Sequence, residues 1–267
     1  WVVGGRGTIL KTTNAGATWV KQESGFQGVL LGVSFTDANN GTAVGANGTI
    51  LRTTDGGTTW SFQNSGTSDY FLGVSFADAN SGAAVGYHGI ARTTDGGATW
   101  KSSAIGSLIS VSVLPGNTVT AVGYYGAIFR EKNPGPVWTK IPCPATISTN
   151  FLSSVAFRDA NNGIAVGAKG TAFRTSDGGT TWASQPVGTI NHLWGVAITS
   201  GNTSTAVGDN GIIRRSTDGG ATWTPQTSGV TVTLRGVFFN NASTGTAVGD
   251  NGTILRTTDA GATWTPQ

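Results

Sequence analysis

Short apolar segments alternate with turn-forming residues along the whole chain. The segments are three to six residues long and rich in β-branched and aromatic residues, a composition typical of β-strands. The separators contain Asn-Gly, Asp-Ala-Asn-x-Gly and Asp-Gly-Gly, which favour tight hairpins and longer turns. No stretch has a helical period of useful length. The pattern therefore predicts an all-β fold.

One unit of four such segments repeats along the chain. It reads L-x-G-V-x-F, D-A-N-x-G, T-A-V-G, x-N-G, T-I-L-R-T, T-D-G-G-A and T-W. We name its four predicted strands A to D, as in residues 32–35, 42–45, 49–53 and from 59 onwards. Four antiparallel strands in about 40 residues are typical of a propeller blade. The repeats are marked, at spacings of 41, 40, 38, 44, 41 and 41 residues, by Trp19, Trp60, Trp100, Trp138, Trp182, Trp223 and Trp264.

Strand C distinguishes a propeller from a two-sheet sandwich. Ile50 and Leu51 are adjacent apolar residues, so both faces of this strand are expected to be buried. Blades packed face to face bury both faces, whereas a sandwich leaves one face of each sheet in water. We therefore predict a single seven-bladed β-propeller domain of four-stranded antiparallel blades over residues 1–267. Strands B to D of the first blade occupy residues 1–22, and six full repeats occupy about 29–63, 70–103, 107–141, 151–185, 192–226 and 233–267.

The ends of the sequence fall within repeats. There are seven copies of the B–C–D phrase but six copies of strand A, the innermost strand of a blade. The chain starts at Trp1 without that strand, and it stops at Gln267, where an earlier copy continues into strand A. A blade without strand A exposes an unpaired edge. We therefore expect the sequence to be part of a longer chain.

The turn between strands C and D carries a second signature. It reads T-T-D-G-G-T-T-W at residues 53–60 and fits the pattern S/T-x-D-x-G-x-T-W, the Asp box of sialidase-like propellers. Asn14 replaces the aspartate in the first blade, and Asn133 does so in an eroded fourth box that precedes the longest insertion, 141–151. The carboxylates can accept backbone N–H bonds within their turns. A structural role is therefore expected for Asp55, Asp95, Asp177, Asp218 and Asp259.

The whole unit, with G-x-A-V-G-x-x-G-x-I-L-R-T-T-D-G-G-x-T-W, resembles the photosystem II stability/assembly factor-like repeat family over essentially all 267 residues. The resemblance implies a non-enzymatic seven-bladed propeller, like the photosynthetic members that assist assembly of the photosystem II reaction centre. Many other members are secreted or periplasmic bacterial proteins. The resemblance thus implies a binding or scaffold protein outside the cytoplasm, whether secreted, periplasmic or in the thylakoid lumen.

Positions that differ between the repeats are free to serve function. Two sets vary: the pair of residues in the hairpin between strands B and C, and the residue that enters strand A. A propeller places both sets on one rim. Aromatic and arginine side chains there are suited to bind a peptide or a sugar, although solvent-facing turns also vary freely. The candidate binding rim comprises Tyr87, His88, Tyr124, Tyr125, His192, Trp194 and Arg235.

Two charged sets have alternative interpretations. Asp209 and Asp250 can bind a cation or act as acid and base, or each can cap its own D-N-G turn. One basic residue per blade recurs on strand C, and this basic ring can meet an acidic partner or hold neighbouring blades together. The basic ring comprises Lys11, Arg52, Arg92, Arg130, Arg174, Arg215 and Arg256.

The composition limits which catalytic, metal-binding and partner-binding sites the chain can form. Of 13 acidic residues, five lie in Asp boxes and three in D-A-N turns, and the chain has two histidines and one cysteine. We therefore expect no catalytic set, no metal cluster and no cofactor. The net charge of +3 argues against nucleic acid, and no segment reaches the roughly 18 apolar residues of a membrane span. A protein partner or a larger parent chain is predicted; a lectin-like propeller that binds glycans and a glycoside hydrolase of the Asp-box class are the alternatives.

Overall fold

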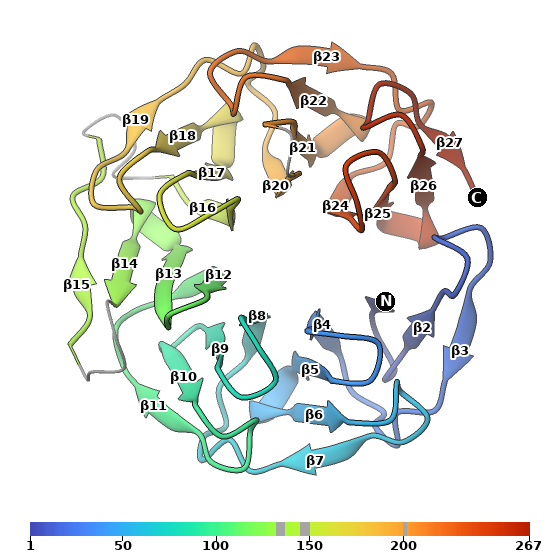
Figure 1. The fold of residues 1–267 in the computed structure, drawn as a ribbon, viewed down its shortest axis with the longest axis vertical. Coiled ribbons are helices and arrows are strands. Elements are labelled where there is room, and N and C mark those ends of the chain that lie inside the picture. Colours follow the sequence, from blue (N-terminus) through green and yellow to red (C-terminus); the bar gives the residue numbers. More distant parts are fainter. Residues whose placement is uncertain (132–136, 145–149, 200–201) are drawn as a thin grey trace. The chain divides into compact units, whose positions relative to one another are not determined.

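The computed structural model describes residues 1–131, 137–144, 150–199 and 202–267. The predicted box with Asn133 and the middle of the insertion lie outside the described residues. The strands form seven antiparallel sheets, one of three strands and six of four, and no α-helix occurs in the described ranges (Figure 1). The fold is therefore the predicted seven-bladed β-propeller, with three strands in its first blade.

The chain consists of two compact units. Unit 1 comprises Trp1–Thr12, Trp19–Ala121 and Phe129–Lys140. Unit 2 comprises Thr13–Thr18, Val122–Ile128 and Ile141–Gln267. Blades 1 to 4 thus lie mainly in unit 1, and blades 5 to 7 lie in unit 2 together with the hairpin of blade 4.

Within each blade the strands lie side by side in sequence order, from strand A at one edge of the sheet to strand D at the other. The strands of blades 1 and 2 are β1 (Val2–Val3), β2 (Ile9–Lys11), β3 (Val20–Gln22), β4 (Leu30–Phe35), β5 (Gly41–Gly45), β6 (Ile50–Thr53) and β7 (Ser61–Gln63). Those of blades 3 and 4 are β8 (Phe71–Phe76), β9 (Gly82–Gly86), β10 (Ile90–Thr93), β11 (Lys101–Ser103), β12 (Leu108–Leu114), β13 (Thr118–Gly123), β14 (Ile128–Glu131) and β15 (Thr139–Lys140).

Blades 5 to 7 repeat the same order. Their strands are β16 (Leu152–Phe157), β17 (Gly163–Gly167), β18 (Ala172–Thr175), β19 (Ala183–Ser184), β20 (Leu193–Ile198), β21 (Ser204–Gly208), β22 (Ile213–Ser216), β23 (Thr224–Gln226), β24 (Leu234–Phe239), β25 (Gly245–Gly249), β26 (Ile254–Thr257) and β27 (Thr265–Pro266). Five hairpins between strands B and C contain a short 3-10 turn. These turns are η1 (Ala46–Gly48), η2 (Tyr124–Gly126), η4 (Ala168–Gly170), η5 (Asp209–Gly211) and η6 (Asp250–Gly252).

The two faces of strand C pack against different apolar clusters, as predicted. In β6, Ile50 packs in a cluster with Phe71 of blade 3, whereas Leu51 packs in a cluster with Ile9 of blade 1. Both side chains are fully buried. Burying an aliphatic side chain of this size contributes about 1.5–3 kcal/mol. Blade 2 is therefore stabilised from both sides.

Strand A carries a β-bulge at its second residue. The register of β20 against β21 shifts between Leu193 and Gly195, which leaves Trp194 as the extra residue. The same shift occurs in β4, β8, β16 and β24. A Cβ added to Gly195 would lie 3.1 Å from the Cα of Gly236 in β24, so this glycine allows the two strands to approach closely. In the L-x-G motif, the glycine therefore allows strand A to pack closely against its neighbour. The bulge turns the side chain of the middle residue in a different direction.

The Asp-box turns are held by their own side chains. In blade 6, Asp218 accepts the Thr222 hydroxyl at 2.6 Å and the backbone N–H groups of Ala221 and Thr222. The Ser216 hydroxyl donates to the same carboxylate and accepts the Gly220 N–H. The bond from the threonine hydroxyl is the main reason why the pKa of Asp218 falls to about 2. Equivalent bonds lower the pKa to about 2 for Asp55, Asp95, Asp177 and Asp259.

The box tryptophan packs edge-on against the phenylalanine that ends strand A of its blade. The Phe239 and Trp264 rings lie 6.1 Å apart at 80°, and the Phe157 and Trp182 rings lie 5.9 Å apart at 82°. Strand D was predicted to begin at residues 59–60, but β7 begins at Ser61. The difference arises because the N–H of Thr59 is bound to the box carboxylate and cannot join the sheet.

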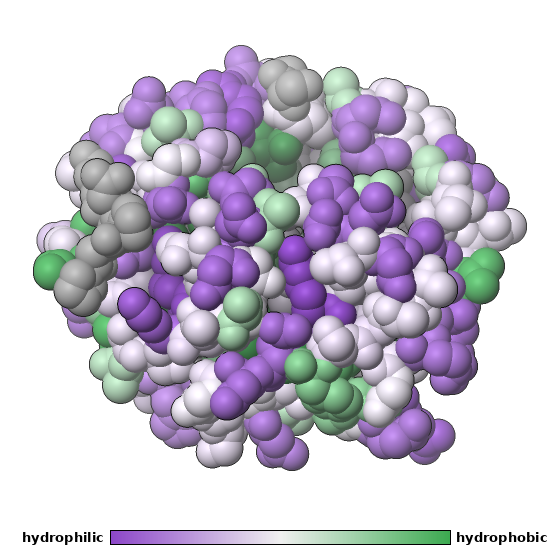
Figure 2. All heavy atoms as spheres, turned by 60° about the horizontal axis from the view of Figure 1, so that its bottom comes forward, coloured by the Kyte–Doolittle hydropathy of each residue, from purple (hydrophilic) through white to green (hydrophobic). Residues whose placement is uncertain are grey.

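Apolar side chains reach the surface at separate places. Phe62 is 60% exposed and Phe238 is 69% exposed, on strands of different blades. On the face drawn in Figure 2, hydrophobic residues form small separate patches among neutral and hydrophilic ones. In the described ranges, no helix has the length and apolar character to cross a membrane.

Candidate functional site

The hairpins between strands B and C are bonded to the loops that lead from strand D into strand A. In unit 2, the Asp209 N–H donates to the His192 carbonyl at 3.0 Å, and the Asp250 N–H donates to the Thr233 carbonyl at 2.9 Å. These bonds bring the two variable sets of repeat positions to the same edge of the unit.

Five aromatic side chains of unit 2 follow one another along this edge, and we call them the aromatic strip: Tyr124, Tyr125, Phe151, His192 and Trp194. Ring centroids lie 6.5 Å apart for Tyr124 and Tyr125, and 6.3 Å apart for Tyr124 and Phe151. The Phe151 ring lies 5.3 Å from both His192 and Trp194, and it stacks on Trp194 at 26°. Tyr125 is 78% exposed. The strip therefore joins blades 4, 5 and 6 by ring contacts.

Three charged side chains, which we call the clamp, fix the end of the strip: Asp209, Arg235 and Asp250. The Trp194 indole N–H donates to Asp209 Oδ1 at 2.7 Å, and the Arg235 guanidinium lies 5.0 Å from the centre of the Trp194 ring. Arg235 binds Asp250 through two hydrogen bonds, of 2.9 and 3.0 Å. These bonds raise the pKa of Arg235 and lower that of Asp250. Trp194 is consequently held in one orientation.

Two side chains from neighbouring blades lie against the Trp194 ring. Phe151 reaches it from blade 5, and Arg235 reaches it from blade 7. Sugar rings and bases that stack on a protein need an open aromatic face. The arrangement instead suits edge contacts with apolar side chains.

The capping interpretation of Asp209 and Asp250 is wrong. The Asp209 carboxylate accepts hydrogen bonds from Trp194 and Thr233, and the Asp250 carboxylate accepts them from Arg235, so neither bonds within its own turn, η5 or η6. The two side chains bind Trp194 and Arg235 instead, each 15 residues away in sequence. Among the described residues, no three His, Cys, Asp or Glu side chains gather as metal ligands would. Asp209 and Asp250 therefore hold Trp194 and Arg235 in position at the end of the aromatic strip.

Phe151 is the member of the strip that the sequence did not identify. It directly precedes Leu152, the buried residue that opens strand A of blade 5. This position also varies between the repeats, and comparison of the copies at this column would have revealed it. The equivalent residues are Val29, Tyr70, Ser107, His192 and Thr233.

Tyr87 and His88 of the candidate binding rim lie in unit 1, on a hairpin that is one residue shorter than that at residues 45–50. The Tyr87 ring stacks on Tyr70 with centroids 5.7 Å apart. The His88 Nδ1 lies 2.9 Å from a carboxylate oxygen of the buried Asp69. Within unit 1, these four side chains form a group of their own.

Six of the seven basic ring residues bind the next blade of their own unit. In unit 2, the Nε of Arg174, Arg215 and Arg256 donates to a backbone carbonyl of an Asp-box turn, at 3.0, 2.7 and 2.9 Å. In unit 1, Lys11 Nζ donates to such a carbonyl at 2.8 Å. Arg130 also interacts with its surroundings.

The two other ring members bind polar groups in unit 1. Arg52 donates to the Ala79 carbonyl at 3.1 Å, and Arg92 pairs with the carboxylate of Glu131 at 3.1 Å. Both arginine side chains are largely buried. In these contacts, the guanidinium groups of Arg52 and Arg92 bind other groups of the protein itself.

Comparison with known proteins gives matches in both sequence and fold. The family model described as photosynthesis system II assembly factor YCF48 matches residues 18–142 and 138–227. A structure of YCF48 bound to D1 peptide has 24% sequence identity and a TM-score of 0.71, over 89% of this chain and 82% of that chain. YCF48 from Cyanidioschyzon merolae has 23% identity and a TM-score of 0.78, over 96% of this chain and 90% of that chain.

The fold is shared more widely than the family. An ancestral GH74 enzyme has 16% identity and a TM-score of 0.70, over 93% of this chain and 37% of that chain. No match was found among curated proteins. The family model, however, spans more than half of the chain and confirms the resemblance seen in the repeats. The chain belongs to the photosynthesis system II assembly factor YCF48 family.

Proposed function

We propose that the chain is a non-enzymatic assembly-factor propeller that binds a segment of a protein partner. Its family membership supports this role, and one YCF48 structure contains a D1 peptide. The observation that carries the proposal is the aromatic strip, whose end is fixed by the clamp. Rigid aromatic anchors beside an arginine are typical of binding hot spots, because little side-chain entropy is lost on binding. A location outside the cytoplasm, as in the thylakoid lumen, is part of the proposal.

The state of the carboxylates supports a non-enzymatic role. The five Asp-box carboxylates have pKa values near 2 because turn hydroxyl and N–H groups bind them. A general acid needs a pKa closer to the working pH. Asp250 is paired with Arg235, which also lowers its pKa. The likeness to GH74 enzymes extends to the fold alone.

Titration of D1 peptide into the protein tests the proposal. We expect Trp194→Ala to weaken binding about tenfold or more, because the variant removes the central anchor of the strip. The matched control is Phe62→Ala, which removes an aromatic ring that is 60% exposed on β7 and lies outside the strip. The control should bind as the wild type does.

Two results would contradict the proposal. Equal affinity of Trp194→Ala and the wild type would show that the strip does not bind the peptide. Binding to a glycan array that disappears in Trp194→Ala, together with no peptide binding, would favour the lectin-like alternative.

A further inference from the structure

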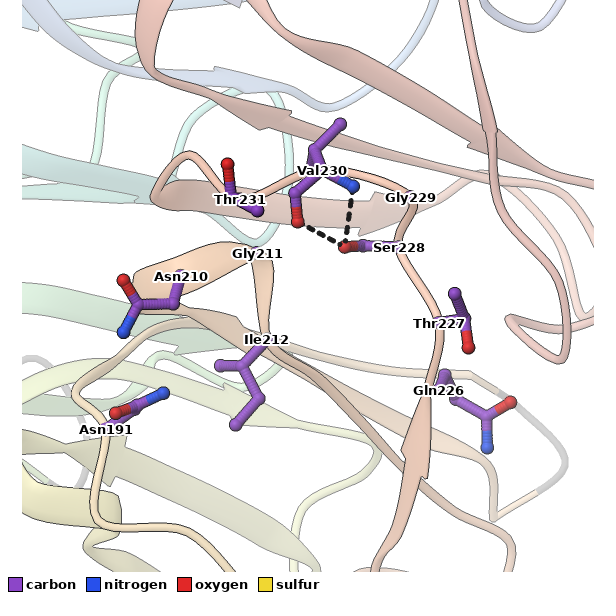
Figure 3. A pocket seen from close by; sticks show the side chains of 10 residues that line it. All are labelled: Asn191, Asn210, Gly211, Ile212, Gln226, Thr227, Ser228, Gly229, Val230 and Thr231. Carbon is purple, nitrogen blue, oxygen red and sulfur yellow. Dashed lines mark hydrogen bonds between the residues drawn. The ribbon is translucent and has the colours of Figure 1, made fainter.

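Unit 2 has an open hollow of about 430 Å³ on its surface (Figure 3). It is bounded by η5 and by the loop that follows β23. Two of its lining residues are direct chain neighbours of site residues: Asn191 precedes His192, and Asn210 follows Asp209. Chain connectivity therefore ties this recess to the strip at His192 and to the clamp at Asp209.

The recess combines uncharged polar side chains with apolar groups. Figure 3 shows Asn191 and Asn210 on one side of Ile212, and Gln226 and Thr227 on the other. None of its ten lining residues is charged or aromatic. This composition offers carboxamides and hydroxyls around two apolar side chains, those of Ile212 and Val230.

Two of the carboxamides are free to bind a ligand. Within the described part of the chain, the side-chain amides of Asn191 and Asn210 have no hydrogen-bond partner, although Asn191 uses its backbone N–H and carbonyl. The Ser228 hydroxyl, by contrast, is occupied by the backbone of Val230. A carboxamide both donates and accepts hydrogen bonds. It thereby complements a peptide group, which offers one N–H and one C=O.

We propose that this recess binds the main chain and a small uncharged polar side chain of the same partner segment whose apolar side chain rests on the aromatic strip. The inference rests on the proposed function and specifies its ligand: an extended peptide with an aromatic residue and, a few positions away, Asn, Gln, Ser or Thr. Main-chain hydrogen bonds supply affinity in such complexes, and side-chain pockets supply specificity.

Other ligand classes fit the recess less well. Phosphate and carboxylate groups are bound by arginine or lysine, and the lining contains neither. Nucleobases stack on aromatic rings, which the lining also lacks. A sugar that stacks on Trp194 would compete with Phe151 and Arg235, which already contact that ring.

Selection from random twelve-residue peptides displayed on phage tests the inference. We expect the wild type to enrich peptides that pair an aromatic residue with an uncharged polar one. Asn191→Ala and Asn210→Gly should each bind an enriched peptide about tenfold more weakly, since each removes one carboxamide. Asn210 has a φ of +58°, which glycine adopts without strain.

The matched control is Asn47→Gly, the same hairpin position in blade 2, where φ is +56°. This variant should bind the enriched peptide as the wild type does.

If both recess variants bind normally while Trp194→Ala does not, the recess inference is overturned and the proposed function stands. If the wild type enriches no peptide, both are overturned. Enriched peptides with charged residues in place of the polar one also overturn the inference, as does glycan binding that is lost in Asn210→Gly.

Discussion

Tyr125 has a backbone conformation that bulky residues seldom adopt. Its φ of +56° and ψ of 33° lie in the left-handed region, where the equivalent hairpin residues of three other blades are asparagines. Such a conformation costs about 1–3 kcal/mol in a residue with a branched or bulky side chain. Because the side chain is 78% exposed, packing does not offset this cost. This strained, exposed aromatic residue fits the binding role proposed for the strip.

We therefore expect Tyr125→Asn to make the protein more stable and the binding weaker. Asparagine tolerates the left-handed region, so the free energy of unfolding should rise by about 0.5–1 kcal/mol. Urea unfolding measures the first effect, and peptide titration measures the second. The control is Lys169→Asn, whose φ is +53° in the hairpin of blade 5. It should be stabilised similarly and keep its affinity; normal affinity in Tyr125→Asn would remove this tyrosine from the site.

The variable positions of the site could be found from the sequence, but its contacts could not. Comparison of the repeats identified Trp194 and Arg235, because both depart from the other copies at one column. It did not identify their partners, because a D-N-G hairpin has the same sequence whether its aspartate caps the turn or binds another strand. The constant separation of 15 residues in both pairs was the available signal.

At the level of elements, blade 1 contains a natural variant of the Asp box. Asn14 accepts the Thr18 N–H at 2.9 Å and donates to the Thr18 hydroxyl at 2.9 Å. In the other described boxes, the threonine hydroxyl donates to a carboxylate, as Thr222 does to Asp218. The turn thus forms with either residue, but only the carboxylate makes it sensitive to pH.

Acid should destabilise the protein through these turns. The box carboxyls have a pKa near 2 when folded and near 3.8 when free, so the unfolded state binds protons more readily as the pH falls. Their contribution is complete above about pH 4 and is lost progressively toward pH 2. We expect the urea midpoint to fall over this range. The decline should be shallower in Asp218→Asn, which keeps the turn; an unchanged decline would show that this box does not contribute.

The elements were predictable because their signals are local. Asn-Gly pairs, Asp boxes and adjacent apolar residues specify each hairpin, turn and buried strand within a few positions. The shorter hairpin of blade 3 was missed, because Tyr87-His88-Gly89 can be aligned with Ala46-Asn47-Gly48 without regard to the residue deleted after it. One missing residue changes the turn type and the direction of two side chains.

At the scale of the whole molecule, the basic ring shows what a repeat pattern leaves undecided. One cation per blade at the same strand position is compatible with a partner-binding surface and with bonds between blades. Which of the two interpretations holds depends on the contacts of the charged ends of these side chains. The neighbouring blade determines those contacts. In unit 2, the Arg215 Nε donates to the Ala260 carbonyl of blade 7 at 2.7 Å. This contact links blade 6 to blade 7.

Arg215→Met should therefore reduce stability and leave binding unchanged. The variant keeps an apolar stem but removes a charged donor to a backbone carbonyl, which should lower the free energy of unfolding by about 1–2 kcal/mol. Arg215→Lys is the matched control, because Lys11 makes the equivalent bond to Gly56 at 2.8 Å in blade 1. Urea unfolding and peptide titration separate the two interpretations of the ring. An Arg215→Met variant with wild-type stability and reduced peptide affinity would assign this side chain to the partner, since a link between blades cannot be removed without a loss of stability.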